Sequence, residues 1–227
     1  MARAFKDRLK ESVKWFLPFY LFTFLPLMSC SEGSDEEYEF DNWEARNDAK
    51  TQEWWNGTSM TKYLSYVVEG SSSKASDYIY VEVLESGDPD GVCPQFTDSC
   101  WVAYRGNLIP TKSYPEGYVF DQTFTGDFDW STAYVTKVCS APNLTTGAAG
   151  LINGFATALL KMRKGDRWRV HIPYQQAYGK NDQSTTTTSS STVTIPGYSN
   201  LTFEIALYDF WHPGESRGTF KARSERE

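Results

Sequence analysis

The chain has 227 residues, of which 40% are hydrophobic, and this is enough to bury the core of one domain of ordinary size with appendages. Its net charge of −7 at pH 7 excludes a protein that binds nucleic acid through a basic surface, because phosphates attract Lys and Arg. The aromatic share of 16% is high, and aromatic side chains either fill a β core or line a ligand pocket.

The N-terminal segment has the pattern of an export signal. A basic leader precedes an apolar run over residues 15–27, which is too short for a comfortable membrane span. The run ends in "LMSC", which resembles the lipobox of bacterial lipoproteins. This resemblance implies a signal peptide over residues 1–29, cleavage before Cys30 and a lipid on the Cys30 thiol. The alternatives are an uncleaved anchor and an ordinary secretory signal.

The stretch "SEGSDEEYEFD" that follows is acidic and poor in apolar residues, which predicts an extended tether over residues 30–40. Acidic residues at this place also resemble the surface-export signal of Bacteroidetes lipoproteins, although a solvated linker has the same composition. The predicted location is the cell envelope, with a lipid anchor at the periplasmic face or the cell surface of the outer membrane.

A helical extension is predicted over residues 41–76. Asp41 and Glu44 have the spacing of an N-cap and capping box, so a helix is expected over residues 42–55. Three tryptophans are expected to dock this helix on the rest of the protein: Trp43, Trp54 and Trp55.

Residues 77–212 are predicted to form one domain. Alternating polarity in "YIYVEVLE", "SCWVAYRG", "DRWRVHIP" and "NLTFEIALYDF" predicts strands, and "GFATALLKMRKG" has helical spacing that ends near Gly165. This order predicts an α+β fold in which an antiparallel sheet curves around one short helix. A long insertion over residues 129–150 and a polar loop over residues 180–192 interrupt the pattern, and residues 213–227 are predicted to be a polar tail.

Strand parity also predicts which side chains share a face. One face of the first long strand should carry Cys100, Val102 and Tyr104, and the other Trp101, Ala103 and Arg105. In the two later strands the inward side chains should be Trp168, Val170, Ile172, Leu201, Phe203, Ile205 and Leu207, and Arg167, Arg169 and His171 should point outward.

Four segments taken in order resemble the motifs of the FKBP family: "WVAYRGNL", "YVFDQ", "GLINGFATALLKMRKGDRWRVHIPYQQAYG" and "IPGYSNLTFEIAL". The resemblance covers about residues 78–210. It implies an FKBP-like sheet of about five strands around the helix and peptidyl-prolyl cis-trans isomerase activity without a cofactor. Its implied partners are proline-containing exported polypeptides and macrolide ligands.

The same resemblance implies an aromatic cleft whose walls and floor are Tyr104, Phe120, Phe155, Tyr178 and Phe203. It places Leu151 and Ile152 at the lip and Ile195 on the rim. The Ile152 N–H and the Tyr178 hydroxyl would bind substrate carbonyls. Asp121 would line the cleft and either position Tyr104 or interact with the twisted carbonyl. Phe155 replaces the Trp that is common in the family, which shrinks the floor, and both interruptions change the rim.

The cysteines and histidines allow further predictions. Proximity in sequence favours a Cys93–Cys100 disulfide, whereas strand parity buries Cys100 and favours Cys93–Cys139 between two loops, which is the pairing we expect. His171 and His212 are isolated and lack the spacing of metal ligands, so no metal site is expected.

Three classes of function remain. The first is an isomerase that assists folding of exported proteins by binding and desolvating X–Pro bonds. The second is a weakly catalytic, proline-binding chaperone module of the envelope. The third is a structural lipoprotein with a degenerate domain, but this class should have lost the cleft residues, and the retained tyrosines and Asp121 favour the first.

Overall fold

The computed structural model describes residues 38–130, 136–139, 150–186 and 192–215. The chain divides into two compact units, Met1–Tyr38 and Glu39–Glu227, and only Tyr38 of the first unit is described. The predicted signal peptide, the predicted lipidation site Cys30 and residues 31–37 of the predicted tether therefore lie outside the described residues. In the described residues of the second unit, no helix has the length and apolar character needed to cross a membrane.

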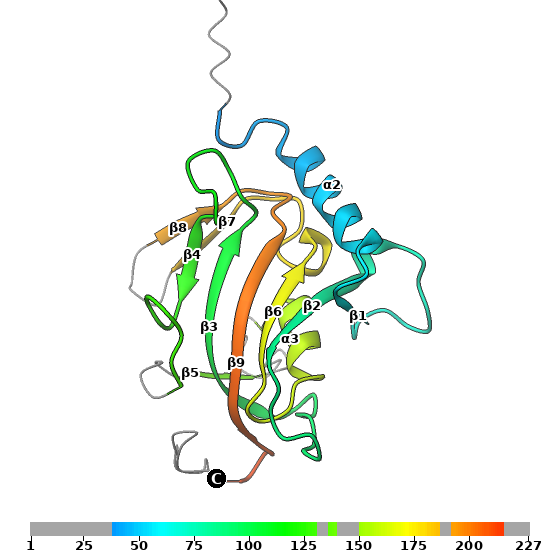
Figure 1. Ribbon diagram of the computed structural model, residues 1–227, viewed down its shortest axis with the longest axis vertical. Helices are drawn as coiled ribbons and strands as arrows, with labels where there is room; N and C mark the ends of the chain where they lie inside the picture. Colours follow the sequence, from blue (N-terminus) through cyan, green and yellow to red (C-terminus); the bar gives the residue numbers. More distant parts are fainter. Residues whose placement is uncertain (1–37, 131–135, 140–149, 187–191, 216–227) are drawn as a thin grey trace, which may run out of the picture. The chain divides into compact units, whose positions relative to one another are not determined.

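The second unit is built on an antiparallel sheet in the order β1-β2-β6-β9-β3-β4, with β5 also pairing with β3 (Figure 1). The bounds are β1 Thr61–Leu64, β2 Tyr78–Glu85, β3 Ser99–Leu108, β4 Val119–Gln122, β5 Thr136–Cys139, β6 Arg167–Ile172 and β9 Leu201–Trp211. This is the predicted α+β class. The described part of the sheet has seven strands, more than the five expected, because β1 and β5 extend it.

Helix α3 (Asn153–Leu159) packs on one face of the sheet and forms the main core with it. The predicted helix residues Phe155, Leu159 and Met162 are buried, and α3 ends before Met162, which lies in the following turn. Every side chain predicted to point inward from β6 and β9 belongs to this core. The period-two assignments on those strands are therefore confirmed.

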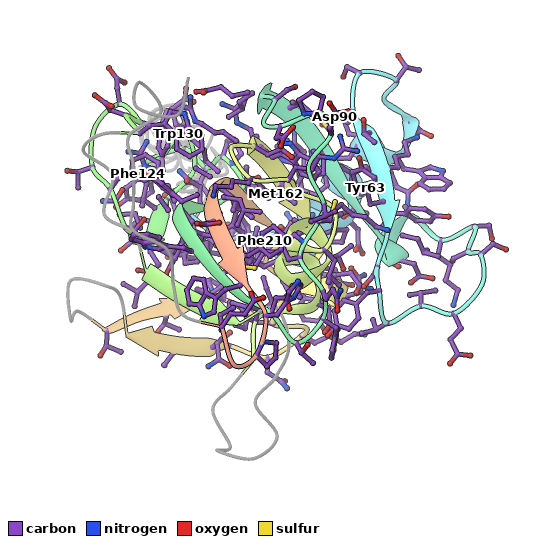
Figure 2. The ribbon with its side chains drawn as sticks, turned by 90° about the horizontal axis from the view of Figure 1, so that it is seen from below. Tyr63, Asp90, Phe124, Trp130, Met162 and Phe210 are labelled. Carbon is purple, nitrogen blue, oxygen red and sulfur yellow. The ribbon has the colours of Figure 1, made fainter. Side chains whose placement is uncertain are left out.

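The opposite face of the sheet carries a second, smaller aromatic cluster. Trp101 and Ala103 of β3 pack there with Phe124, Trp130 and Tyr208. Figure 2 shows Phe124 and Trp130 close together at one side of the view, with Tyr63, which packs against the main core, at the other. The predicted division of β3 between two faces is correct, and both of these faces are buried.

Helix α2 (Trp43–Asn56) confirms the predicted helix but not its capping box. The N-cap residue is Asn42, which has the left-handed backbone conformation with φ of 51°. Its side chain makes no capping hydrogen bond. The first turn of the helix is closed by the hydrogen bond from the Arg46 N–H to the Asn42 carbonyl. Trp43 and Trp54 are buried as expected. Trp54 covers His171, which leaves that outward-facing histidine only 9% exposed.

The polar stretch predicted as a loop is a hairpin in its described part. Strands β7 (Gln183–Thr186) and β8 (Thr192–Ile195) pair antiparallel as a separate two-stranded sheet, at the upper left in Figure 1. Threonine favours extended backbone, so this composition suits a strand as well as a loop. Two short 3₁₀ turns, η1 (Ala75–Asp77) and η2 (Tyr174–Gln176), complete the described elements.

Candidate active site

Four aromatic rings from four different elements meet on the α3 side of the sheet. Phe203 of β9 is at the centre, with its ring centroid 5.5 Å from Phe120 of β4, 5.2 Å from Phe155 of α3 and 6.2 Å from Tyr104 of β3. The ring planes of Phe120 and Phe155 are nearly perpendicular to that of Phe203, which is the favourable edge-to-face arrangement. The structure thus brings together four of the five predicted aromatic residues of the cleft.

Gly106 of β3 allows these rings to approach. A Cβ atom at this position would lie 2.6 Å from Cζ of Phe120 and 2.7 Å from Cε1 of Phe203, so any larger residue would displace the rings. Sequence reasoning missed Gly106 as a site residue. The available signal was a glycine inside a strand, which often marks a close approach.

Asp121 follows Phe120 in β4 and fixes the orientation of Tyr104. The Tyr104 hydroxyl donates a hydrogen bond of 2.7 Å to Oδ2 of Asp121, while Oδ1 of Asp121 accepts one of 3.0 Å from the Gln122 N–H. Hydrogen bonds to an ionised acceptor are stronger than neutral ones. The carboxylate therefore holds the Tyr104 ring in place at the edge of the aromatic cluster.

Tyr178 is carried by the turn after β6. The η2 turn starts at Tyr174, and Gly179 closes the segment with φ of +79°, a conformation that favours glycine. The Tyr178 side chain is 38% exposed, and its hydroxyl has no hydrogen-bond partner among the described residues. Burial, and secondly the negative charge of Asp121, raise the pKa of Tyr178, so its hydroxyl stays protonated at neutral pH.

The two residues predicted to form the lip of the cleft lie at the start of α3. Leu151 and Ile152 are half-buried and pack against the main core, and Ile152 is the N-cap residue of the helix. In the part of the chain that the structure describes, the Ile152 N–H donates to no acceptor. A substrate carbonyl is a suitable partner for a backbone donor of this kind.

Ile195, which the resemblance places on the rim, is a buried residue in the structure. It is only 1% exposed and belongs to the main core, because it is the last residue of β8, where the hairpin returns to the domain. Its contribution is to anchor the hairpin.

The predicted Cys93–Cys139 disulfide is wrong for this structure. Cys93 is a free, half-buried thiol, and its Sγ lies 3.4 Å from the Lys161 carbonyl oxygen. Cys139 belongs to strand β5 opposite Ser99, and not to a loop that is free to reach Cys93. Cys100 is fully buried in the main core, as strand parity predicted. Within the described residues, no group of three or more His, Cys, Asp and Glu side chains is placed to hold a metal ion.

Comparison with known proteins identifies the family. Residues 93–208, slightly more than half of the chain, match the family model for FKBP-type peptidyl-prolyl cis-trans isomerases. The macrophage infectivity potentiator of Trypanosoma cruzi is 32% identical over 124 residues, which are 55% of this chain and 49% of that protein. The FKBP-type 22 kDa peptidyl-prolyl cis-trans isomerase of Escherichia coli K12 is 28% identical over 141 residues, which are 62% of this chain and 53% of that protein. The chain thus spans about half the length of these relatives.

Among solved structures, a peptidyl-prolyl cis-trans isomerase from Pseudomonas syringae aligns with a TM-score of 0.49 and 20% identity, over 75% of this chain and 95% of that chain. The family match covers β3, β4, α3, β6, the turn after β6 and most of β9, which carry the aromatic rings, Asp121 and Tyr178. The chain is therefore a member of the FKBP-type peptidyl-prolyl cis-trans isomerase family.

Proposed function

We propose that the protein catalyses cis-trans isomerisation of X–Pro peptide bonds. The observation that carries this proposal is an aromatic cluster combined with two donors that have no partner among the described residues: the Tyr178 hydroxyl, which feels the charge of Asp121, and the N–H of Ile152, the N-cap residue of α3. An apolar floor suits a proline ring, and the two donors suit the carbonyls on either side of it.

The chemistry needs no covalent step. Rotation about the peptide bond is slow because resonance makes it partly double, with a barrier of about 18–20 kcal/mol. The planar amide is the more polar form and is stabilised by water, whereas the twisted transition state has lost the resonance. A cleft that excludes water therefore favours the twisted form relative to the planar one, and binding becomes tighter in the transition state than in the ground state.

The residues have distinct roles in this proposal. Phe120, Phe155 and Phe203 hold the proline ring, and Tyr178 and Ile152 anchor the backbone on each side of the bond. Asp121 acts through Tyr104, which it orients by the 2.7 Å hydrogen bond, and its charge favours the protonated hydroxyl of Tyr178. A macrolide that occupies the same floor is expected to compete with the substrate.

We also propose that the clients are exported polypeptides and that the protein is tethered to the envelope by a lipid on Cys30. The support is the sequence pattern of basic leader, short apolar run and "LMSC". Cys30→Ala should abolish incorporation of labelled fatty acid. Labelling that persists in this variant would exclude the anchor, and protease treatment of whole cells would distinguish the periplasmic face from the cell surface.

The activity is tested with purified residues 31–227 and a short X–Pro peptide in an isomerisation assay. Tyr178→Phe removes one hydrogen bond, worth about 0.5–1.5 kcal/mol, and should lower kcat/KM by about 2- to 10-fold. A rate with the intact protein that equals the uncatalysed rate would contradict the proposal. Slowed aggregation of an unfolded client under those conditions would favour the proline-binding chaperone instead.

A further inference from the structure

Helix α2 lies outside the residues that match the family model, yet it buries polar side chains against the domain. Asn47 is fully buried and Thr51 is 4% exposed, both on the face of the helix that meets the domain. Burying an amide or a hydroxyl is unfavourable unless it is hydrogen-bonded. The hydrogen-bond partners of these two side chains therefore show which segment the helix binds.

Most of these partners lie in the segment between β8 and β9. The backbone N–H of Asn200 donates to Oδ1 of Asn47 over 2.8 Å, and its side-chain Nδ2 donates to the Asn47 carbonyl over 2.6 Å and to Oγ1 of Thr51 over 3.0 Å. In the preceding turn of α2, Nε1 of Trp43 donates to Oγ of Ser199 over 2.9 Å. Four hydrogen bonds therefore join α2 to residues 199–200.

The Asn200 side chain also holds the turn that carries Tyr178. Its Oδ1 accepts a 2.9 Å hydrogen bond from the Tyr174 N–H, the first residue of η2. The Tyr174 carbonyl accepts from the Gly179 N–H, and the Gly179 carbonyl accepts from the Tyr198 N–H, each over 2.9 Å. The rings of Tyr174 and Tyr198 meet edge to face at 5.3 Å. Residues 174–179 are thus tied to residues 198–200 at both ends.

The connecting segment needs this support, because Tyr198 has φ of 61°, an unfavourable conformation for a residue with a side chain. Figure 1 shows the end of β6 and the start of β9 at the same end of the sheet, beside α2. One amide, that of Asn200, is hydrogen-bonded to the helix through its nitrogen and to the Tyr178 turn through its oxygen.

We propose that α2 is a positioning element for the active site and that Asn47 and Asn200 are its positioning residues. Through them the helix fixes the turn that aims the Tyr178 hydroxyl at the substrate. The expected effect of substitutions in α2 on kcat/KM rests on the proposed isomerase function. Their expected effect on the flexibility of the turn at residues 174–179 is independent of catalysis.

Asn47→Ala removes the acceptor for the Asn200 N–H and loosens the turn without altering any side chain of the cleft. Its kcat/KM for an X–Pro peptide is expected to fall about tenfold, because small misplacements of a contacting group are costly.

Thr51→Val removes a single acceptor and should have a smaller effect in the same direction, whereas Thr51→Ser keeps the hydroxyl and should retain the wild-type rate. Trp54→Phe is the control on the same helix, since Trp54 packs on Tyr80 and His171 and makes no hydrogen bond or ring contact with residues 196–200, all of which the structure describes.

Amide hydrogen exchange of the full chain supplies the second readout. In Asn47→Ala the peptides covering residues 174–179 and 198–201 should exchange at least tenfold faster, while those of β2 and β6 are unchanged; Trp54→Phe should not show this pattern. Equal losses of rate and protection in both variants, or no change in either readout for Asn47→Ala, would overturn the inference. An inactive wild-type protein that still shows the localised change in exchange would contradict the isomerase function and leave the positioning role standing.

Discussion

Asp121 serves two tyrosines of the cleft by different means. It accepts the Tyr104 hydroxyl directly, and it acts on Tyr178 through its charge, which helps to keep the Tyr178 hydroxyl protonated. Because Tyr104 is hydrogen-bonded to the carboxylate and Tyr178 is influenced by its charge, the two effects can be separated by substitution.

Asp121→Ala and Tyr104→Phe each remove the same hydrogen bond. Because a hydrogen bond to a charged group contributes about 1.5–3 kcal/mol, each variant should lower kcat/KM by about tenfold or more. At neutral pH the double variant should be little worse than either single one, since each single variant already lacks the hydrogen bond and the Tyr178 hydroxyl stays protonated without the Asp121 charge. Peptide isomerisation kinetics measure all three, and losses that simply multiply in the double variant would show that Asp121 acts on the substrate independently of Tyr104.

Among the secondary-structure elements, the sequence predicted best those strands that bury one face in the core. The alternation in β6 and β9 identified the core side chains because a period of two leaves few other arrangements. Strands β1, β5, β7 and β8 were not predicted. Each has four residues and few apolar positions, so its pairing depends on a partner distant in sequence and not on its own pattern.

Among the site residues, too, some could be predicted from the sequence and others could not. The aromatic residues, Asp121 and Tyr178 were predictable because family motifs place them in order along the chain. Three features could not be predicted: the role of Gly106, the burial of Ile195 and the hydrogen bonds of Asn200. Each depends on contacts between segments that are distant in sequence, and no local sequence pattern specifies such contacts.

Helix α2 should contribute to stability mainly through Trp54. This side chain is 2% exposed and lies against Tyr80 and His171, with ring centroids at 5.8 and 5.0 Å. Trp54→Ala should lower the free energy of unfolding by about 3–5 kcal/mol, as expected for a large buried aromatic residue. Trp55→Ala is the matched control, because Trp55 is only partly buried, and urea denaturation should show a clearly smaller loss for it. Equal losses would mean that α2 is not docked through its buried face.

At the scale of the whole molecule, the two histidines of the chain respond to pH in opposite directions. Burial under α2 lowers the pKa of His171 below its usual value, although Glu82, 3.4 Å away, partly opposes this effect. The hydrogen bond to Asp98 over 2.7 Å raises the pKa of His212, just after the end of β9.

These shifts determine how each histidine affects stability. Below a pH of about 6.5 the unfolded chain protonates His171 more readily than the folded protein does, so its contribution is lost as the pH falls. The folded protein binds the His212 proton more tightly than the unfolded chain. The contribution of His212 is therefore fully present below a pH of about 6.5 and is lost as the pH rises through the raised pKa of the folded state.

Single substitutions should separate the two contributions. In His212→Gln only His171 remains, and the free energy of unfolding should increase between about pH 5.5 and 7 relative to the histidine-free double variant. In His171→Gln only His212 remains, and the same comparison should show a decrease as the pH rises. Urea denaturation across this range, with the double variant as the baseline for all other groups, measures both slopes. If His171→Gln gained stability with rising pH relative to that baseline, the Asp98–His212 interaction would not hold the proton in the folded state, and the end of β9 would not be anchored by it.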